Sequence, residues 1–123
     1  GRPLLLTGDK SQLQQVILNL ITNASESFPS DITIQKQIVI KTDLCMDFLE
    51  LTVTDNGAGI SPEIKSNIFE LLRTNKESGM GIGLWLSKTI VESHKGSITF
   101  NTALNTGTCF TVRLPIKDDN VFF

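Results

Sequence analysis

The sequence predicts an α/β sandwich in which about three helices cover one face of a mixed β-sheet. The expected order along the chain is strand, helix, two strands, short helix, loop, helix and two strands, without the strict alternation that builds a doubly wound parallel sheet. The strands alternate apolar and polar residues, as in a sheet with one buried face. At 123 residues, the chain has the length of a single domain, residues 1–123, which we expect to be excised from a longer protein.

The N-terminal part is expected to form a short strand, a long helix and a hairpin. Leu4–Thr7 is an apolar strand candidate, and Asp9, followed three residues later by Gln12, has the pattern of a helix N-cap. Apolar residues then recur at helical spacing as far as Phe28, and Pro29 stops the helix. Two strands around a short turn follow, Gln37–Thr42 and Asp47–Asp55.

The C-terminal part is expected to contain two helices and a second hairpin. Ser61 and Pro62 have the chemistry of a helix start, and this short helix should reach about Phe69. Residues 70–83 are rich in Gly, Ser, Asn and charge, which predicts a mobile segment before a helix from Ile82 to about His94. The last two strands flank an Asn-Thr-Gly turn and are Gly96–Thr102 and Thr108–Leu114.

Composition excludes several classes of protein. With 40% hydrophobic and 20% charged residues, the chain is neither disordered nor fibrous. The net charge is −2 and the 11 basic residues are scattered, so the sequence does not predict a basic surface for binding nucleic acid or an anionic membrane. Cys45 and Cys109 lack a metal-binding spacing, so we expect two small buried hydrophobes in a reducing cytosol. No apolar run approaches the roughly 20 residues that span a bilayer.

Asn19 and Asn23 stand one turn apart on the long helix, beside its apolar arc. Such a pair is often only a solvated face, but asparagine competes with the helix backbone and is a costly choice in mid-helix. An uncharged oxygen suits Mg²⁺ beside a triphosphate, where a carboxylate would repel phosphate. The pair is therefore a candidate metal and phosphate site.

Asp55 has the same parity as Leu51 and Val53, so its carboxylate faces the apolar side of the sheet and needs a partner. Gly57 and Gly59 follow and would let the backbone approach a flat ligand, such as an adenine whose amino group binds Asp55. The same pattern is found in tight turns, whereas a calcium loop is excluded because the positions from Ile60 onward lack oxygen ligands.

Glycines 79, 81 and 83 alternate immediately before a predicted helix. Accessible backbone N–H groups and a helix N-terminus make this segment a candidate phosphate site, although it would also suit a flexible hinge. It is neither a Walker loop nor a dinucleotide fingerprint. Arg73 and Lys76 lie just upstream and would reach phosphate oxygens from a lid, unless they are simply solvated charges.

Four blocks stand in register along the chain: Asn19-Leu-Ile-Thr-Asn23-Ala, Asp55-Asn-Gly-Ala-Gly59-Ile, Ile68-Phe69-Glu70 and Gly79-Met-Gly-Ile-Gly83-Leu. Together they resemble the N, G1, F and G2 boxes of the ATP-binding domain of two-component sensor histidine kinases. The ending, Gly107 to Pro115, resembles the closing strand of that family. The resemblance covers essentially the whole chain and implies the Bergerat-type sandwich, which is also found in gyrase, mismatch-repair ATPases and some chaperones.

The resemblance implies a cytoplasmic domain that binds Mg-ATP and donates the γ-phosphoryl group to a histidine on a separate dimerisation domain, upstream of a response regulator. Asn23 would coordinate Mg²⁺, Asn19 would support the metal and phosphates, and Lys76 would face the terminal phosphate. Asp55 would hold the adenine amino group, and Thr108 would reach adenine through water. The full set of implied ATP-binding residues is Asn23, Asp55, Gly57, Gly59, Ile60, Arg73, Lys76, Gly79, Gly81, Ile82, Gly83, Leu84 and Thr108.

Thr74-Asn75-Lys76 resembles the lid of the nitrogen- and oxygen-sensing subclass, with Leu72 and Asn75 departing from the usual pattern. Glu26 stands where many members carry a basic phosphate contact, although it is common in this subclass. In the gyrase and chaperone ATPases, a glutamate takes the place of Asn19 and activates water. An amide cannot act as that base, so transfer to an acceptor is favoured over hydrolysis.

His94 is the only histidine, and it precedes Lys95 and Gly96 at the end of a helix, without the residues that follow acceptor histidines in the family. We expect a structural role there, as a charge at a helix C-terminus, and a monomeric domain that binds no nucleic acid and makes no direct membrane contact. Membrane anchoring of the parent protein is left open. Two alternatives remain at this point: a degenerate nucleotide pocket that serves as a regulatory module, or a serine kinase or ATPase of the same superfamily.

Overall fold

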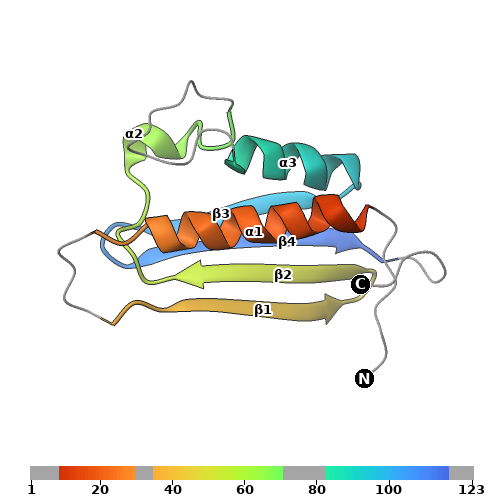
Figure 1. Cartoon of the computed structure of the whole chain (residues 1–123), viewed down its shortest axis with the longest axis horizontal. Coiled ribbons are helices and arrows are strands. Elements are labelled where there is room, and N and C mark those ends of the chain that lie inside the picture. Colours follow the sequence, from red (N-terminus) through yellow and green to blue (C-terminus); the bar gives the residue numbers. More distant parts are fainter. Residues whose placement is uncertain (1–8, 30–34, 71–82, 117–123) are drawn as a thin grey trace.

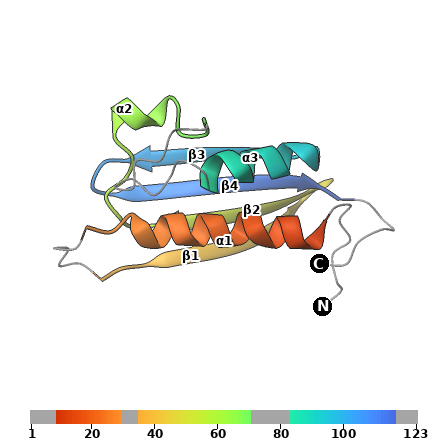
Figure 2. The ribbon, with the colours of Figure 1, turned by 45° about the horizontal axis from the view of Figure 1, so that its top comes forward.

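The computed structural model describes residues 9–29, 35–70 and 83–116. Its described strands form one sheet in the order β1-β2-β4-β3, and every neighbouring pair is antiparallel. Helices α1 and α3 lie side by side on one face of this sheet (Figures 1 and 2). The elements are α1 Lys10–Glu26, β1 Ile38–Cys45, β2 Phe48–Asp55, α2 Pro62–Lys65, α3 Gly83–Ser93, β3 Ser97–Ala103 and β4 Gly107–Pro115.

The described part of the sheet differs in one respect from the mixed sheet that the sequence predicted. Two antiparallel hairpins, β1-β2 and β3-β4, join through an antiparallel β2-β4 pair, so none of the four described strands has a parallel neighbour. The strand predicted at Leu4–Thr7 and most of the segment predicted to be mobile lie outside the described residues. The two-layer sandwich itself is confirmed.

Helix α1 begins as the sequence predicted, because Asp9 accepts a hydrogen bond from the backbone N–H of Gln12 at 3.2 Å. It ends at Glu26 rather than Phe28, since Ser27 N–H turns back to Ala24 O and closes the last turn. Helix α2 is likewise shorter than expected. The chain leaves it through i→i−3 turns that bring Ile68 into the core.

The core fills the space between the sheet and the two long helices. Phe110 of β4 is 2% exposed and packs with Phe69 and Phe100 in an aromatic cluster with ring centroids 5.7 to 6.3 Å apart. This cluster holds the segment after α2 against the sheet. The other buried apolar residues are Leu13, Val16, Leu20, Ala24, Leu49, Leu51, Val53, Ile60, Ile68, Leu84, Ile90, Val91, Ile98, Val112 and Leu114.

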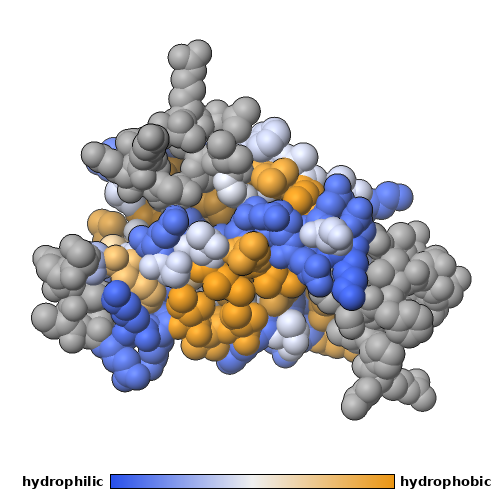
Figure 3. Space-filling model, viewed as in Figure 1, coloured by the Kyte–Doolittle hydropathy of each residue, from blue (hydrophilic) through white to orange (hydrophobic). Residues whose placement is uncertain are grey.

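Strand β1 contrasts with β2, its partner in the same hairpin. Ile38, Ile40 and Leu44 pair with inward-facing residues of β2, but they remain exposed because α1 packs mainly against β2 rather than β1. Figure 3 shows the resulting apolar area on the viewed face, next to α1. Cys45 and Cys109 are free and half-buried, not fully buried as expected. No helix in the described part of the chain is long and apolar enough to cross a membrane.

Candidate functional site

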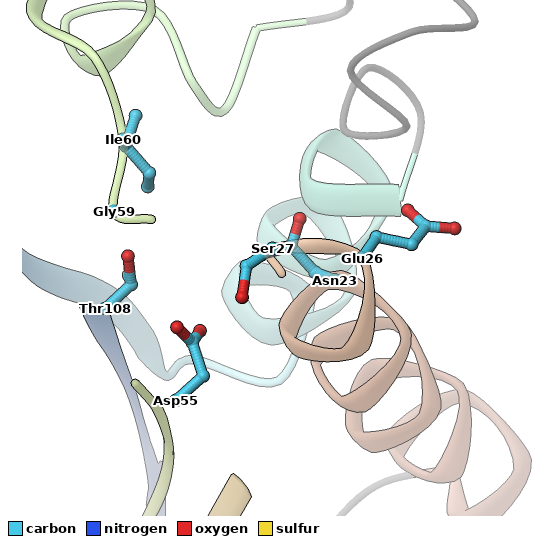
Figure 4. Close-up of a pocket in the computed structure, with 7 residues that line it drawn as sticks. All are labelled: Asn23, Glu26, Ser27, Asp55, Gly59, Ile60 and Thr108. Carbon is cyan, nitrogen blue, oxygen red and sulfur yellow. The ribbon is translucent and has the colours of Figure 1, made fainter. Parts of the chain in front are cut away.

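A pocket opens where the C-terminal end of α1 meets the end of the sheet (Figure 4). One of its walls is the helix end, and the other is formed by the end of β2, the loop after it and the start of β4. The pairing of β2 with β4 brings these segments together, because Asp55 and Thr108 are direct cross-strand partners. The lining residues are Asn23, Glu26, Ser27, Asp55, Gly59, Ile60 and Thr108.

Asp55 lies on the helix side of β2, as its parity with Val53 predicted, and is only 5% exposed. Its Oδ1 accepts a hydrogen bond from Gly57 N–H at 2.8 Å, which fixes the carboxylate. Figure 4 shows this carboxylate directed into the pocket. No second partner lies among the described residues, so the remaining acceptor capacity faces the pocket. A buried carboxylate with a free acceptor is suited to bind a ligand that donates a hydrogen bond.

A row of polar side chains crosses three strands at this end of the sheet. Asp55 pairs with Thr108 of β4, and Thr108 pairs in turn with Thr102 of β3. The two threonine hydroxyls are 2.9 Å apart. Sequence reasoning missed Thr102. The signal was present, because Thr102 shares the parity of the apolar Ile98 and Phe100 and is therefore a polar residue on a buried face.

The loop after β2 is held from both sides. Ala58 donates its backbone N–H to Ser27 O at 3.1 Å and accepts from Asn105 N–H at 2.8 Å, so it bridges α1 and the β3-β4 turn. A Cβ atom at Gly57 would come within 2.8 Å of the Ser27 carbonyl oxygen, so this glycine is needed for close packing against α1. Gly59 has φ +78°, a conformation that favours glycine, at the mouth of the pocket.

The two asparagines of α1 have different surroundings in the structure. Asn23 is half-buried and lines the pocket, where its amide oxygen is a candidate metal ligand. Asn19 accepts from Gln15 Nε2 at 2.7 Å and donates to Gly83 O and Ser87 Oγ, both at 3.3 Å. Asn19 therefore ties α1 to the first turn of α3.

The predicted phosphate-binding segment is only partly described. Gly83 is the first residue of α3 and packs beside Asn19, while Leu84 is 1% exposed and points into the core. Glu26 is exposed at the edge of the pocket. The remaining residues that the resemblance assigned to phosphate binding lie outside the described residues: Arg73, Lys76, Gly79, Gly81 and Ile82.

Both ring nitrogens of His94 are engaged at the opposite end of the helices. Nε2 accepts from the backbone N–H of Asp9 at 2.9 Å, and Nδ1 lies 2.8 Å from Ile90 O. The expected structural role is therefore accounted for by hydrogen bonds that link the start of α1 to the end of α3.

Residues 8–118 match the model of the histidine kinase-, DNA gyrase B- and HSP90-like ATPases, and the chain belongs to this family. Among solved structures, it resembles the mycobacterial sensor histidine kinase MprB, with a TM-score of 0.75 and 27% identity over 91% of this chain and 75% of that one. It also resembles the catalytic domain of the histidine kinase ThkA, with a TM-score of 0.74 and 29% identity over 89% and 70% of the two chains.

Curated relatives agree with the structural matches. The chain is 34% identical to the sensor protein FixL of Bradyrhizobium diazoefficiens over 94% of its own length, and 38% identical to sporulation kinase A of Bacillus subtilis over 93%. It spans only 23% of the first relative and 18% of the second. The chain is therefore homologous to the catalytic domains of sensor histidine kinases.

Proposed function

We propose that this domain binds Mg-ATP in the pocket and donates the γ-phosphoryl group to a histidine on a separate dimerisation domain of the same kinase, in the cytoplasm. A response regulator would receive the phosphoryl group next. The observation that carries the proposal is the buried Asp55 carboxylate, which Gly57 fixes and which faces the pocket. The other implied ligand-binding residues are assigned by family resemblance and by their positions around this carboxylate.

Adenine fits the sheet wall of the pocket. Its exocyclic amino group would donate to Asp55, and a charge-assisted hydrogen bond of this kind contributes about 1.5–3 kcal/mol. The apolar edge of the base would pack against Ile60, which lines the same wall. Ile60 is buried and is held in place through its backbone N–H, which donates to Thr102 at 2.9 Å.

Magnesium fits the helix wall. Asn23 offers an uncharged oxygen at the edge of the pocket, and Mg²⁺ is commonly held by one or two protein oxygens together with substrate phosphates. The bound ion would neutralise charge on the phosphates. Asn19 would act indirectly by fixing the start of α3, since its amide is already engaged with Gln15, Gly83 and Ser87.

Two features favour transfer to a separate acceptor. Asn19 occupies the position of the water-activating glutamate in the related ATPases, and an amide cannot accept a proton from water. His94 is the only histidine of the chain, and its ring is committed to Asp9 and Ile90. Both features support a phosphoryl acceptor on another domain, with catalysis by positioning and electrostatic stabilisation.

Nucleotide binding is tested by calorimetry with ATP in the presence and absence of Mg²⁺. We expect Asp55→Asn to weaken ATP binding by about 10- to 100-fold, because the replacement amide offers one acceptor in place of a charged pair. Asp43→Asn, an exposed change on β1, is the matched control and should leave the affinity unchanged. Equal affinity of the wild type and Asp55→Asn would overturn the adenine assignment, and no affinity in the wild type would favour a degenerate regulatory module.

Phosphoryl transfer is tested with γ-labelled ATP and a histidine-bearing dimerisation fragment of the parent kinase. The expected product is an acid-labile phosphohistidine on the fragment, with little phosphate released when this domain is incubated alone. Steady ATP turnover by the isolated domain would instead indicate an ATPase. Label on a serine of a partner protein would indicate a serine kinase.

A further inference from the structure

The hydroxyl group of Thr102 makes three contacts next to the pocket. It lies 2.9 Å from Ile60 N, 3.2 Å from Gly107 O and 2.9 Å from the hydroxyl of Thr108. The residues that line this pocket do not include Thr102. Its influence on the pocket therefore passes through Ile60 and Thr108, which both line it, and Thr108 is only 4% exposed.

The donors and acceptors in this cluster allow one arrangement that satisfies all three contacts. A hydroxyl has one hydrogen to donate and two lone pairs to accept with. Ile60 N–H can only donate, so Thr102 accepts from it, and Gly107 O can only accept, so Thr102 donates to it. The remaining lone pair of Thr102 must then accept from the Thr108 hydroxyl.

This arrangement determines which groups the pocket offers to a ligand. Because the Thr108 hydrogen is directed to Thr102, only acceptor lone pairs of Thr108 remain for the pocket. Asp55, the cross-strand partner of Thr108, also presents only acceptor oxygens. The end of the sheet is therefore an all-acceptor surface, which favours a donor and disfavours another acceptor.

We infer that Thr102 is a positioning residue for nucleotide selection, which orients the Thr108 hydroxyl so that the pocket accepts a purine with an amino group at C6 and rejects one with a keto group. The inference rests on the proposed nucleotide function. It places the specificity determinant on β3, one strand beyond the residues that line the pocket. In this arrangement Thr108 faces the C6 substituent directly, in place of the water-mediated contact that the family resemblance implies. A rigid pair of acceptors would then leave the keto oxygen of inosine or guanosine triphosphate facing two lone-pair sources without a hydrogen between them.

The test compares the affinities of ATP and inosine triphosphate, which differ at C6 by an amino and a keto group. In Thr102→Val the Thr108 hydroxyl is released and can turn to donate to a keto oxygen. We expect the dissociation constant of inosine triphosphate divided by that of ATP to fall about tenfold, roughly 1.4 kcal/mol. Most of this change should come from tighter binding of inosine triphosphate. Thr102→Ser retains the hydroxyl and should keep the wild-type ratio, as should Thr99→Val, an exposed change on the same strand.

The ratio separates orientation from simple structural support. Valine also leaves Ile60 N–H without its partner, but a displaced loop would weaken both nucleotides by the same factor. Equal weakening of both would therefore overturn the inference while the proposed function stands. Absence of ATP binding in the wild type would instead overturn the proposed function.

A second variant keeps the test decisive if Thr102→Val does not fold. Thr108→Val removes the oriented acceptor itself, so the ratio of the inosine triphosphate and ATP dissociation constants should also fall in this variant. In a folded double variant, the ratio should equal that of Thr108→Val alone, because Thr102 acts through Thr108. A wild-type ratio in folded Thr108→Val would overturn the inference.

Discussion

The two walls of the pocket are built in different ways. On the sheet wall, Asp55 and Thr108 are paired across neighbouring strands and are almost fully buried, with hydrogen bonds to Gly57 and Thr102. On the helix wall, the Asn23 side chain is half-buried and that of Glu26 is exposed. Neither side chain has a hydrogen-bond partner among the described residues. The comparison indicates that the sheet wall, the proposed base-binding end, is preorganised, whereas the proposed metal and phosphate end would acquire its geometry with the ligand.

The largest effect should come from breaking the sheet wall at Gly107. Its φ is +131°, and a Cβ atom there would lie 2.9 Å from Asn56 Cα and closer still to the carbonyl oxygen of Asp55. Gly107→Ala should therefore lower the free energy of unfolding by about 2–5 kcal/mol, from backbone strain and the displaced strand end. Urea unfolding followed by circular dichroism measures this change.

The matched control for this variant is Gly83→Ala. Among the described residues, the nearest atoms to a Cβ at Gly83 belong to Asn19, at 3.8 Å and beyond, so this part of the fold should tolerate the methyl group. We expect its unfolding free energy to remain within about 0.5 kcal/mol of the wild type. If Gly107→Ala left the free energy of unfolding unchanged, the sheet wall would be able to adjust to the added methyl group. The contrast between the two walls would then disappear.

A smaller effect is expected on the helix wall from Asn23→Ala. Loss of the proposed oxygen ligand should reduce ATP affinity in the presence of Mg²⁺ by about tenfold, roughly 1.4 kcal/mol. Without Mg²⁺ the variant and the wild type should bind ATP equally. Unfolding should be unaffected, because Asn23 has no hydrogen-bond partner among the described residues. Calorimetry with and without Mg²⁺ measures the difference.

Asn101→Ala, an exposed change on β3, is the control for Asn23→Ala and should alter neither affinity nor stability. An equal loss of ATP affinity with and without Mg²⁺ would show that Asn23 contacts the nucleotide itself. The helix wall would then resemble the sheet wall, and the assignment of Asn23 to the metal would be wrong.

Local patterns explain why much of the fold could be predicted from the sequence. The Asp9 cap, the two hairpins and the helix ending before Gly96 all depend on residues close together in the chain. The exposure of β1 could not be predicted in this way. Its apolar residues alternate as those of β2 do, but α1 packs mainly against β2, and helix placement is a tertiary property.

The candidate site likewise contains residues whose placement could be predicted from local sequence and residues whose placement depends on tertiary packing. Asp55 could be predicted because the parity of one strand shows which side its carboxylate faces. Thr102 could not be assigned a role, since its partners Ile60 and Thr108 belong to other segments and become neighbours only in the folded sheet. Asn19 was singled out from the sequence as a candidate site residue, but its contact with Gly83 spans 64 positions of the chain, so its link to α3 emerged only from the structure.

The smallest effect should come from His94, which lies at the other end of the helix layer from the pocket. His94→Ala removes the contacts of the ring with Asp9 N–H and Ile90 O, so we expect a loss of about 1 kcal/mol in unfolding free energy. ATP affinity should remain within about twofold of the wild type, because neither pocket wall depends on this contact. Transfer to the dimerisation fragment should also persist, since the acceptor histidine is proposed to lie elsewhere. Loss of transfer in a folded His94→Ala variant that still binds ATP would make His94 part of the reaction and would contradict the proposed separate acceptor.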